Sequence, residues 1–435
     1  MKIFRDPIHN VIDLDTGDKQ INDLILKLID SKDFQRLRFI KQLGLANYAY
    51  PSANHARFEH SLGVAYLAKR FIDKLLAKET VILHQIKDGK TYDQFAIFFS
   101  RLRKDRIVTI LAALLHDIGH GPLSHVSEPI TGVRHEYWVR EILLGNTEIN
   151  RILTKYDADY PKNIWDILSN SCENPMPTAK LISGQLDIDK IDYLLRDAHM
   201  TGSEYGKFDI EWLINVINVG IVNGHVEIGL DLERGLSVAE GFVIARINMF
   251  KNVYLHKISS VAQNMLMIIF ERIRDTRELV DIHPIQKIFI DNIDPTTIKS
   301  HLEDYLDMTD IEMNYFLKSL KESKDAVLKK LSQDLMYRNF FKEVSKNEYD
   351  TAVAHINTTK GEHMSKYYTT VVDVVDRKGG LRYRPDKDQI FVFDKKGIGY
   401  DLAEKSAMIN TSKKENDYEL QYFIDRDIYL ELYRR

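Results

Sequence analysis

The sequence has little of what marks secreted or membrane proteins. Its 435 residues include one cysteine, Cys172, so no internal disulfide can form, which favours a reducing compartment. The N-terminus has no apolar signal-peptide core, and no run approaches the roughly 18 uncharged apolar residues that a membrane span needs. We therefore expect a cytoplasmic protein that does not cross a membrane.

A strong excess of either charge is also missing. The net charge is −4, which argues against nucleic-acid binding as the main function. Hydrophobic residues make up 44% of the chain and charged residues 29%, so a sizeable core can form, and the length suggests two or three domains.

Apolar residues at three- and four-residue spacings predict a mainly helical first two-thirds of the chain. The segments with this pattern are 20–43, 60–77, 107–120, 136–154, 180–200 and 235–275. One β-hairpin interrupts them, because the short runs Val219–Val222 and His225–Ile228 flank the turn pair Asn223-Gly224. Segment 78–106 is polar, and we expect it to be an excursion from the helical core.

The character of the sequence changes near residue 290. Helical pieces rich in Lys, Asp and Glu are followed by strand-like runs at Tyr367–Val375 and Gln389–Phe393, with turns at Asp376–Gly380 and Asp394–Gly397. We therefore predict a mainly α fold, with a helical domain and its hairpin over residues 1–290 and a C-terminal α+β appendage of unassigned role over residues 291–435.

The most informative motif is His116-Asp117, at the end of the apolar run Ile107–Leu115. This run predicts a buried helix that Gly121-Pro122 ends. Burying an imidazole beside a carboxylate costs free energy unless a positive group pairs with them, and a divalent metal ion is one such group. An isolated His-Asp pair is weak evidence, so its interpretation depends on the surrounding sequence.

Polar residues gather in four clusters that could form one site. In chain order they are Asn54–Gly63 around His60, His116–His135, Gln185–Asp197, and the ladder Arg246, Phe250, Tyr254 and Lys257. Helical spacing would place His116 and His120 on one face, and Asp189, Tyr193 and Asp197 in one stripe. Taken alone, each cluster also fits an ordinary role as a helix cap, a satisfied histidine, an ion-paired surface helix or an interface helix.

Two histidines and two aspartates in these clusters form a candidate metal-ligand set: His60, His116, Asp117 and Asp189. Such nitrogen and oxygen donors suit Fe, Mn, Ni, Zn or Co, whereas Mg is expected only as a second ion on nucleotide phosphates. An ion held there would activate water for attack on phosphorus, and nearby Arg and Lys side chains would hold the anionic oxygens.

The order His60, His116-Asp117, Asp189 resembles that of the HD-domain metal-dependent phosphohydrolases. Longer strings are similar to those of the deoxynucleoside triphosphate (dNTP) triphosphohydrolases of this family: Phe34–Gly44, Arg57–Gly63, His116–His125 and Asp189–Tyr193. The vertebrate members add a sterile-alpha motif, which this chain lacks. The resemblance covers roughly residues 1–275 and does not extend to the C-terminal third.

The resemblance implies hydrolysis of a dNTP to a deoxynucleoside and inorganic triphosphate. It also implies roles for matching residues, namely metal ligands (His60, His116, Asp117, Asp189), phosphate-binding cations (Arg57, Lys190, Arg246), active-site histidines (His120, His125, His135), sugar-facing residues (Tyr193, Asp197, Tyr254), and Gln42 and Leu43 beside the 3′-hydroxyl and the 2′ carbon. His125 matches a general acid for the leaving 5′ oxygen. Glu128 stands where close relatives carry Asp, and Phe250 where the vertebrate relative has His.

Regulation by a guanine nucleotide is a further implication of the resemblance. The residues that match an activator pocket between the subunits of a tetramer are Lys2, Asp30, Gln35, Arg38 and Lys257. Alternatively, the arginines and aspartates of this segment pair with one another on a solvated helix. Glu211 stands where the vertebrate relative has an Arg in its second activator pocket, so a simpler activation scheme is expected.

Two other functions stay open from the sequence. One is a different HD-type phosphohydrolase, acting on a nucleoside monophosphate, a cyclic nucleotide or a guanosine alarmone. The other is a non-enzymatic nucleotide sensor or scaffold. The Gln42-Leu43 pair and the Tyr193…Asp197 spacing favour the dNTP triphosphohydrolase over the first, and the complete set of metal-ligand residues argues against the second.

Overall fold

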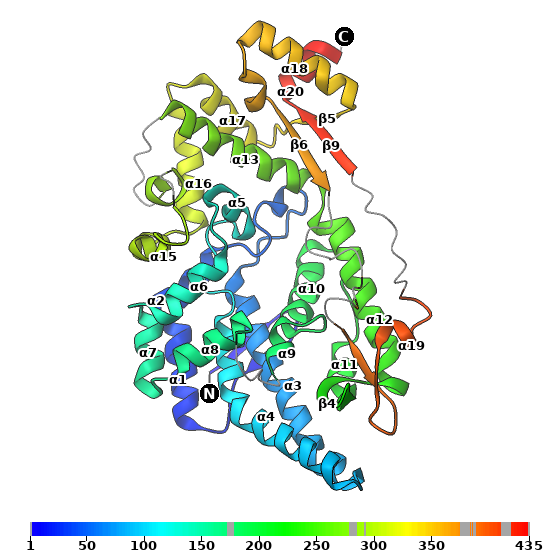
Figure 1. Ribbon diagram of the computed structural model, residues 1–435. Helices are drawn as coiled ribbons and strands as arrows, with labels where there is room; N and C mark the ends of the chain where they lie inside the picture. Colours follow the sequence, from blue (N-terminus) through cyan, green and yellow to red (C-terminus); the bar gives the residue numbers. More distant parts are fainter. Residues whose placement is uncertain are drawn as a thin grey trace.

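Helices make up most of the chain, which confirms the predicted mainly α fold (Figure 1). The computed structural model describes residues 2–171, 178–277, 285–290, 293–374, 383, 385, 389–409 and 419–433. The helices are α1 Lys19–Asp30, α2 Lys32–Gln35, α3 Arg57–Gln85, α4 Gly89–Leu115, α5 Ser127–Thr131, α6 His135–Leu144, α7 Glu148–Tyr156, α8 Tyr160–Ser169, α9 Ala179–Ser183, α10 Ile188–Thr201, α11 Ile210–Val216, α12 Leu232–Met249, α13 Lys257–Thr276, α15 Leu302–Leu306, α16 Asp310–Ser319, α17 Ala326–Met336, α18 Lys346–Lys360, α19 Leu402–Lys405 and α20 Arg426–Tyr433.

Three small sheets accompany the helices. Their strands are β1 Ile3–Asp6, β2 Asn10–Asp13, β3 Ile217–Val222, β4 His225–Asp231, β5 Lys342–Val344, β6 Thr369–Val374, β7 Phe391–Phe393, β8 Gly399–Asp401 and β9 Glu419–Ile424. The sheets have the orders β1-β2, β3-β4-β7-β8 and β5-β9-β6. The predicted hairpin is confirmed, since β3 and β4 pair with Val222 opposite His225, and Asn223 and Gly224 take φ values of 50° and 82° in the turn.

Several segments predicted as single helices are broken, so these predictions were wrong in detail. The breaks follow α1, α6, α9 and the end of α12, and a residue near each break caps the next helix with its side chain: Ser31, Thr147, Asp187 and His256. Such a cap stabilises a new helix start by accepting from its first free backbone N–H groups. Within segment 235–275, the π-helical turn η4 Phe250–Tyr254 also separates α12 from α13.

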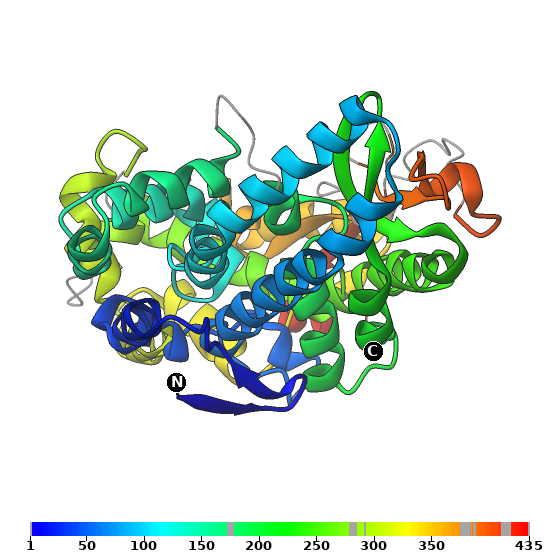
Figure 2. The same cartoon turned by 90° about the horizontal axis from the view of Figure 1, so that it is seen from below.

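The polar excursion at 78–106 is itself helical. α3 and α4 continue through it as a long antiparallel pair that projects from the body, at the lower edge of Figure 1 and across the top of Figure 2. The chain reverses at Ile86–Asp88, and the Asp88 carboxylate caps α4 by accepting from Thr91 N. The hairpin therefore brings the start of α3 and the end of α4 to the same end of the pair, inside the body.

The core has two parts, and both include residues from either side of position 290. One contains the apolar faces of α3, α4, α10 and α12 together with Val392 and Leu402. The other packs α13 against α17 and the β5-β9-β6 sheet, and includes Trp138 and Leu123. Strand β7 also pairs in parallel with β4. The division of the chain near residue 290 stays a prediction.

The C-terminal strand predictions are confirmed by β6 and β7, within the runs Tyr367–Val375 and Gln389–Phe393. The predicted turn at Asp376–Gly380 lies outside the described residues, as does Cys172. Within the parts of the chain that the structure covers, no helix has the length and apolarity needed to cross a membrane.

Candidate active site

Three helix ends meet at the centre of the molecule and carry the predicted metal ligands. His60 lies in the first turn of α3, and Asp189 in the first turn of α10. α4 ends at Leu115, so His116 is its C-cap and Asp117 lies in the turn that follows. The prediction that His116 and His120 share one helix face was therefore wrong. The turn after α4 packs tightly against α6, since a Cβ on Gly119 would lie only 2.4 Å from the His135 carbonyl oxygen. This close packing fits a compact turn better than a continued helix.

The ligand atoms of the four residues face one another. His60 Nε2 lies 3.3 Å from His116 Nε2 and 3.0 Å from Asp189 Oδ1. The Asp117 carboxylate lies 3.5 Å from His60 Nε2 and 3.4 Å from His116 Nε2, and Asp189 Oδ1 lies 3.5 Å from His116 Nε2. Ligands at about 2.0–2.2 Å from one ion are separated by distances of this size. The structure thus brings the four candidate ligands close together, and their role as metal ligands stays a prediction.

The chemistry of this donor set fits a divalent cation. Burial works against ionisation of Asp117 and Asp189, but Arg57 and the histidines outweigh it and hold the pKa of both carboxyls well below the usual range. Burial likewise opposes protonation of His60, but its bonds to Asp189 and Asp192 raise its pKa to about 10. The carboxylates thus attract positive charge, and a metal ion bound to neutral imidazoles would supply it in place of protons.

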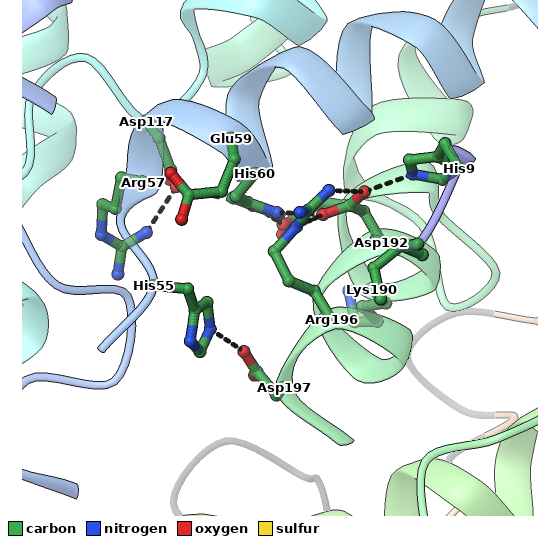
Figure 3. Close-up of polar contacts among 12 residues, drawn as sticks. His9, His55, Arg57, Glu59, His60, Asp117, Lys190, Asp192, Arg196 and Asp197 are labelled. Carbon is green, nitrogen blue, oxygen red and sulfur yellow. Dashed lines mark hydrogen bonds and ion pairs between the residues drawn. The ribbon is translucent and has the colours of Figure 1, made fainter. Parts of the chain in front are cut away.

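A buried ion-pair network behind His60 fixes the orientation of its ring (Figure 3). Asp192 Oδ2 lies 2.8 Å from His60 Nδ1, and the same carboxylate pairs with His9 and Arg196. Arg196 in turn donates to Asp6 at 2.7 Å. An acceptor on Nδ1 leaves Nε2 of His60 to face the ligand cluster, as is usual for histidines that bind metals.

Asp192→Asn is expected to weaken metal binding by about 10- to 100-fold, because the carboxylate that orients His60 loses its charge. Metal content after dialysis and activity against added metal would measure the effect, and high metal should restore activity. Asp6→Asn is the matched control, since Asp6 contacts the opposite side of Arg196 and does not touch His60. Equal metal affinity in the two variants would contradict this role of Asp192.

Arg57 connects the ligand cluster to the loop that follows α4. Its Nη1 lies 2.5 Å from Asp117 Oδ2, and its Nε donates to Ser124 Oγ at 2.7 Å. The side chain is buried, with Asp117 as its carboxylate partner. A buried guanidinium at this point provides a positive potential beside the ligand cluster.

The second polar cluster brings the predicted catalytic residues together. His120 Nε2 lies 3.3 Å from Asp117 Oδ1, and the His120 ring stacks on that of His135 with centroids 3.8 Å apart. Glu128 Oε1 accepts from His125 Nδ1 at 2.6 Å and from His135 Nδ1 at 2.8 Å. Burial and the neighbouring Arg57 hold the pKa of His120 well below its usual range, so His120 is neutral at pH 7.

The second cluster could also hold an ion, because donor atoms lie close together on four of its residues: His120, His125, Glu128 and His135. However, Glu128 already satisfies His125 and His135 by hydrogen bonds, and these bonds outweigh its burial and hold the pKa of its carboxyl well below the usual range. The first cluster is therefore the better candidate for the metal.

Residues predicted to face the sugar lie on the other side of α10. Asp197 accepts from Tyr254 OH at 2.8 Å through one carboxylate oxygen and pairs with His55 Nε2 at 2.8 Å through the other. The Tyr193 and Tyr254 rings meet edge to face. Gln42 is buried and its Oε1 has no hydrogen-bond partner among the described residues. A buried amide oxygen without a partner is costly and is suited to a ligand hydroxyl.

The remaining predicted phosphate-binding cations point to local partners. Lys190 Nζ pairs with Asp187 at 2.5 Å, and Arg246 Nη1 donates to Gln185 Oε1 at 2.9 Å. The predicted ladder from Arg246 to Lys257 on one helix face is wrong, because η4 and the extended His256 interrupt the helix. Lys257 instead begins α13 and pairs with Glu343.

Three of the predicted activator-pocket residues lie together at the surface. Arg38 Nε donates to Gln35 Oε1 at 2.7 Å, and its guanidinium stacks over the Phe58 ring at 3.5 Å. Asp30 is exposed at the end of α1. The ammonium group of Lys2 lies over the Phe4 ring. Glu211 forms a bidentate ion pair with Arg70 at 2.8 and 2.6 Å.

The sequence interpretation gave no individual role to several residues whose side chains are buried around the site: His9, His55, Asp192, Arg196 and Asp310. For Asp192 and Arg196 a signal was present, since they lie three and seven residues beyond Asp189 on the same helix. His9 and Asp310 come from distant segments, and no local pattern connects them to the ligands.

Comparison with known proteins supports this site. A model described as the HD domain matches residues 57–197, which include all four candidate ligands. The uncharacterised protein YwfO of Bacillus subtilis is 30% identical over 97% of this chain and 92% of its own length. The human deoxynucleoside triphosphate triphosphohydrolase SAMHD1 is 26% identical over 91% of this chain, which covers 65% of that protein.

A solved structure of similar fold is a phosphohydrolase from Bacteroides thetaiotaomicron. It is 26% identical, with a TM-score of 0.77, over 97% of this chain and 98% of that one. A hypothetical protein from Aquifex aeolicus, 25% identical, has a TM-score of 0.70 over 99% of this chain and 98% of its own. The chain belongs to the HD-domain phosphohydrolase family that includes the deoxynucleoside triphosphate triphosphohydrolases.

Proposed function

We propose that this protein hydrolyses dNTPs to a deoxynucleoside and inorganic triphosphate. The observation that carries the proposal is the convergence of His116, Asp117 and Asp189 on His60, whose Nε2 lies 3.0–3.5 Å from a donor atom of each of them, beside the buried Arg57. A divalent transition metal held by these four residues would lower the pKa of a water molecule and polarise a phosphoryl oxygen. Mg²⁺ would accompany the nucleotide phosphates.

In this proposal the cations around the ligand cluster hold the triphosphate. Arg57, which bridges Asp117 and Ser124 beside the ligand cluster, would meet an α-phosphate oxygen. Lys190 and Arg246 would exchange their present partners, Asp187 and Gln185, for the outer phosphates. Such fixed positive groups stabilise the charge that develops on the phosphoryl oxygens during cleavage.

The leaving 5′ oxygen requires a proton when its bond to the α-phosphorus breaks. We assign this proton to Nε2 of His125, while its Nδ1 donates to Glu128. Glu128 stabilises the protonated ring and orients it, as a buried carboxylate does in other acid–base pairs. His135, which shares the same carboxylate oxygen, restrains Glu128 from the other side.

Glu128→Gln is expected to lower kcat by about 10- to 100-fold with little change in KM, because the acid loses its orienting carboxylate but the binding groups remain. Steady-state kinetics with a single dNTP would measure this. Glu322→Gln is the matched control, since Glu322 is exposed and pairs with Lys321. An unchanged kcat in Glu128→Gln would remove the His125–Glu128 pair from the mechanism.

The identity of the products tests the proposed function directly. Purified protein is incubated with each dNTP and each ribonucleotide, singly and in pairs, with Mg²⁺ or Mn²⁺, and nucleoside and phosphate products are separated. Tripolyphosphate together with a deoxynucleoside is the expected result. Pyrophosphate or orthophosphate release, or turnover only of a monophosphate, cyclic nucleotide or alarmone, would favour another HD-type phosphohydrolase. Binding without turnover would indicate a nucleotide sensor.

We also propose that a guanine nucleotide activates the enzyme through a pocket built around Asp30, Gln35 and Arg38 in a homotetramer, with Lys2 and Lys257 as further cations. A carboxylate can accept from guanine N1–H and the N2 amine, and the Gln-Arg pair can address O6 and N7. Because Glu211 pairs with Arg70 and brings no positive charge of its own, one nucleotide per pocket is expected.

Addition of dGTP is expected to raise dATP turnover about 5- to 100-fold in the wild type, the usual range for a coupling between two sites. Asp30→Ala should abolish this increase, whereas Asp23→Ala, on an exposed part of the same helix, should keep it. Sedimentation with and without dGTP would show whether activation accompanies tetramer assembly. Full activation of Asp30→Ala would exclude this pocket.

A further inference from the structure

One buried carboxylate from the segment beyond residue 290 contacts two loops of the candidate site. Asp310, the first residue of α16, is 5% exposed. Its Oδ1 accepts from Leu123 N at 2.7 Å, and its Oδ2 accepts from Lys41 N at 3.0 Å. These backbone groups belong to two segments defined here as the 41–44 turn, which carries Gln42 and Leu43, and the 117–126 loop, which carries His120 and His125.

The 117–126 loop holds an unusual backbone conformation at the point where Asp310 binds it. Leu123 and Ser124 both have φ of 59°, in the left-handed region that is unfavourable for side chains larger than glycine. Such residues persist only where the surrounding structure holds them. The bond from Leu123 N to Asp310 is one restraint of this kind.

The 41–44 turn and the 117–126 loop also contact each other directly. Ser124 Oγ donates to Lys41 O at 2.5 Å while it accepts from Arg57. A Cβ on Gly44 would lie 2.7 Å from Leu123 O, so the two backbones approach as closely as the glycine allows. A displacement of one segment would therefore move the other, together with Arg57.

The charge on Asp310 does not favour the folded state. Burial raises the pKa of this carboxyl to about 6, although the two backbone N–H groups and the cations Lys41 and Arg57 oppose the rise. Because the folded pKa lies above the ordinary value, ionised Asp310 costs folding free energy above about pH 6, and protonation relieves it.

We infer that Asp310 is a positioning residue of the active site, which fixes the 41–44 turn against the 117–126 loop. In the proposed function, the turn reads the sugar and the loop supplies the general acid and the contact to Arg57. Asp310 then sets the distance between the sugar-reading groups and the acid. This inference rests on the proposed function for its catalytic consequence, but not for its structural one.

The test compares Asp310→Asn with Glu312→Ala. Asn keeps one acceptor oxygen, so one of the two backbone N–H groups loses its partner, whereas Glu312 caps the same helix through Thr309 and touches neither loop. Hydrogen exchange followed by mass spectrometry should show peptides from the 41–44 turn or the 117–126 loop exchanging about tenfold faster in Asp310→Asn only. The thermal midpoint at pH 7.5 should change little, because the lost hydrogen bond opposes the relief of the buried charge.

Kinetics provide the second readout. Asp310→Asn should lower kcat for dATP by about tenfold, with metal content unchanged, and should narrow the preference for dATP over ATP. If both segments of Asp310→Asn exchanged at the same rates as in the wild type, the inference would be overturned, whether or not the protein releases tripolyphosphate. Faster exchange with unchanged kcat and unchanged selectivity would overturn the catalytic role of Asp310. Absence of tripolyphosphate with the wild type would instead reject the proposed function, and the exchange data would still decide whether Asp310 holds the two segments.

Discussion

Replacing His116 or Asp117 with alanine is expected to reduce dNTP hydrolysis by at least about a thousandfold, the range expected when a metal site loses both its ion and its activated water. Each residue supplies a ligand atom to the cluster, and Asp117 also pairs with the buried Arg57. The two residues follow the end of α4 and lie outside the apolar core, although Asp117→Ala also leaves the buried Arg57 without its carboxylate partner. Metal content by elemental analysis and tripolyphosphate release would therefore fall together.

His84→Ala provides the control for the histidine substitution, because His84 lies exposed in the last turn of the projecting α3. Circular dichroism should show the same helix content in all variants. Loss of activity in His116→Ala with full metal occupancy would move His116 from the ligands to another catalytic role. Near-normal turnover with normal metal content would mean that the site has been assigned to the wrong residues.

The second large expected effect is discrimination between deoxyribose and ribose substrates. We expect kcat/KM for dATP to exceed that for ATP by roughly tenfold to a hundredfold, because an apolar side chain at position 43 leaves a buried 2′-hydroxyl without a partner, which costs about 1–3 kcal/mol. Leu43 lies in the 41–44 turn beside the buried Gln42, whose amide oxygen is available to a 3′-hydroxyl. Tyr254, held by Asp197, provides the opposite wall in this proposal.

Leu43→Ala should narrow the preference, mainly by raising kcat/KM for ATP, since the smaller side chain admits the hydroxyl with a water molecule. Leu144→Ala, at an exposed position that is 40% accessible, should leave the ratio unchanged. Equal kcat/KM for dATP and ATP in the wild type would contradict the assignment of Leu43. A ratio that is unchanged in Leu43→Ala would place the discrimination on another residue.

The ligand set could be predicted from the sequence because each member lies in a dense local pattern. His60 and His116-Asp117 stand at predicted helix ends, Asp189 lies inside the predicted helical segment 180–200, and their order along the chain resembles a known family. The helical pattern also identified α10, on which Asp189, Tyr193 and Asp197 lie at successive turns. Periodicity is strongest in such long segments, so these parts of the fold were predicted correctly.

Other parts of the site depend on contacts that no local pattern contains. The pairs His9–Asp192 and His55–Asp197 join residues more than 140 positions apart, and the Asp310 bonds join residues more than 180 positions apart. Helix boundaries were also missed where a capping side chain competes with continued periodicity, as at His256. A long segment with apolar residues at helical spacing does not by itself distinguish one bent helix from two helices separated by a capping residue.

The parallel pairing of β7 with β4 has a consequence for biosynthesis. Leu230 and Asp231 pair with Val392 and Phe393, so one edge of the hairpin β3-β4 has no partner until the ribosome has translated more than 160 further residues. Exposed strand edges are sites of mispairing between chains, and distant pairings form slowly. The nascent polypeptide therefore carries an open edge through most of the synthesis of its C-terminal third, and a chaperone that covers residues 225–231 during this interval would raise the yield of native protein.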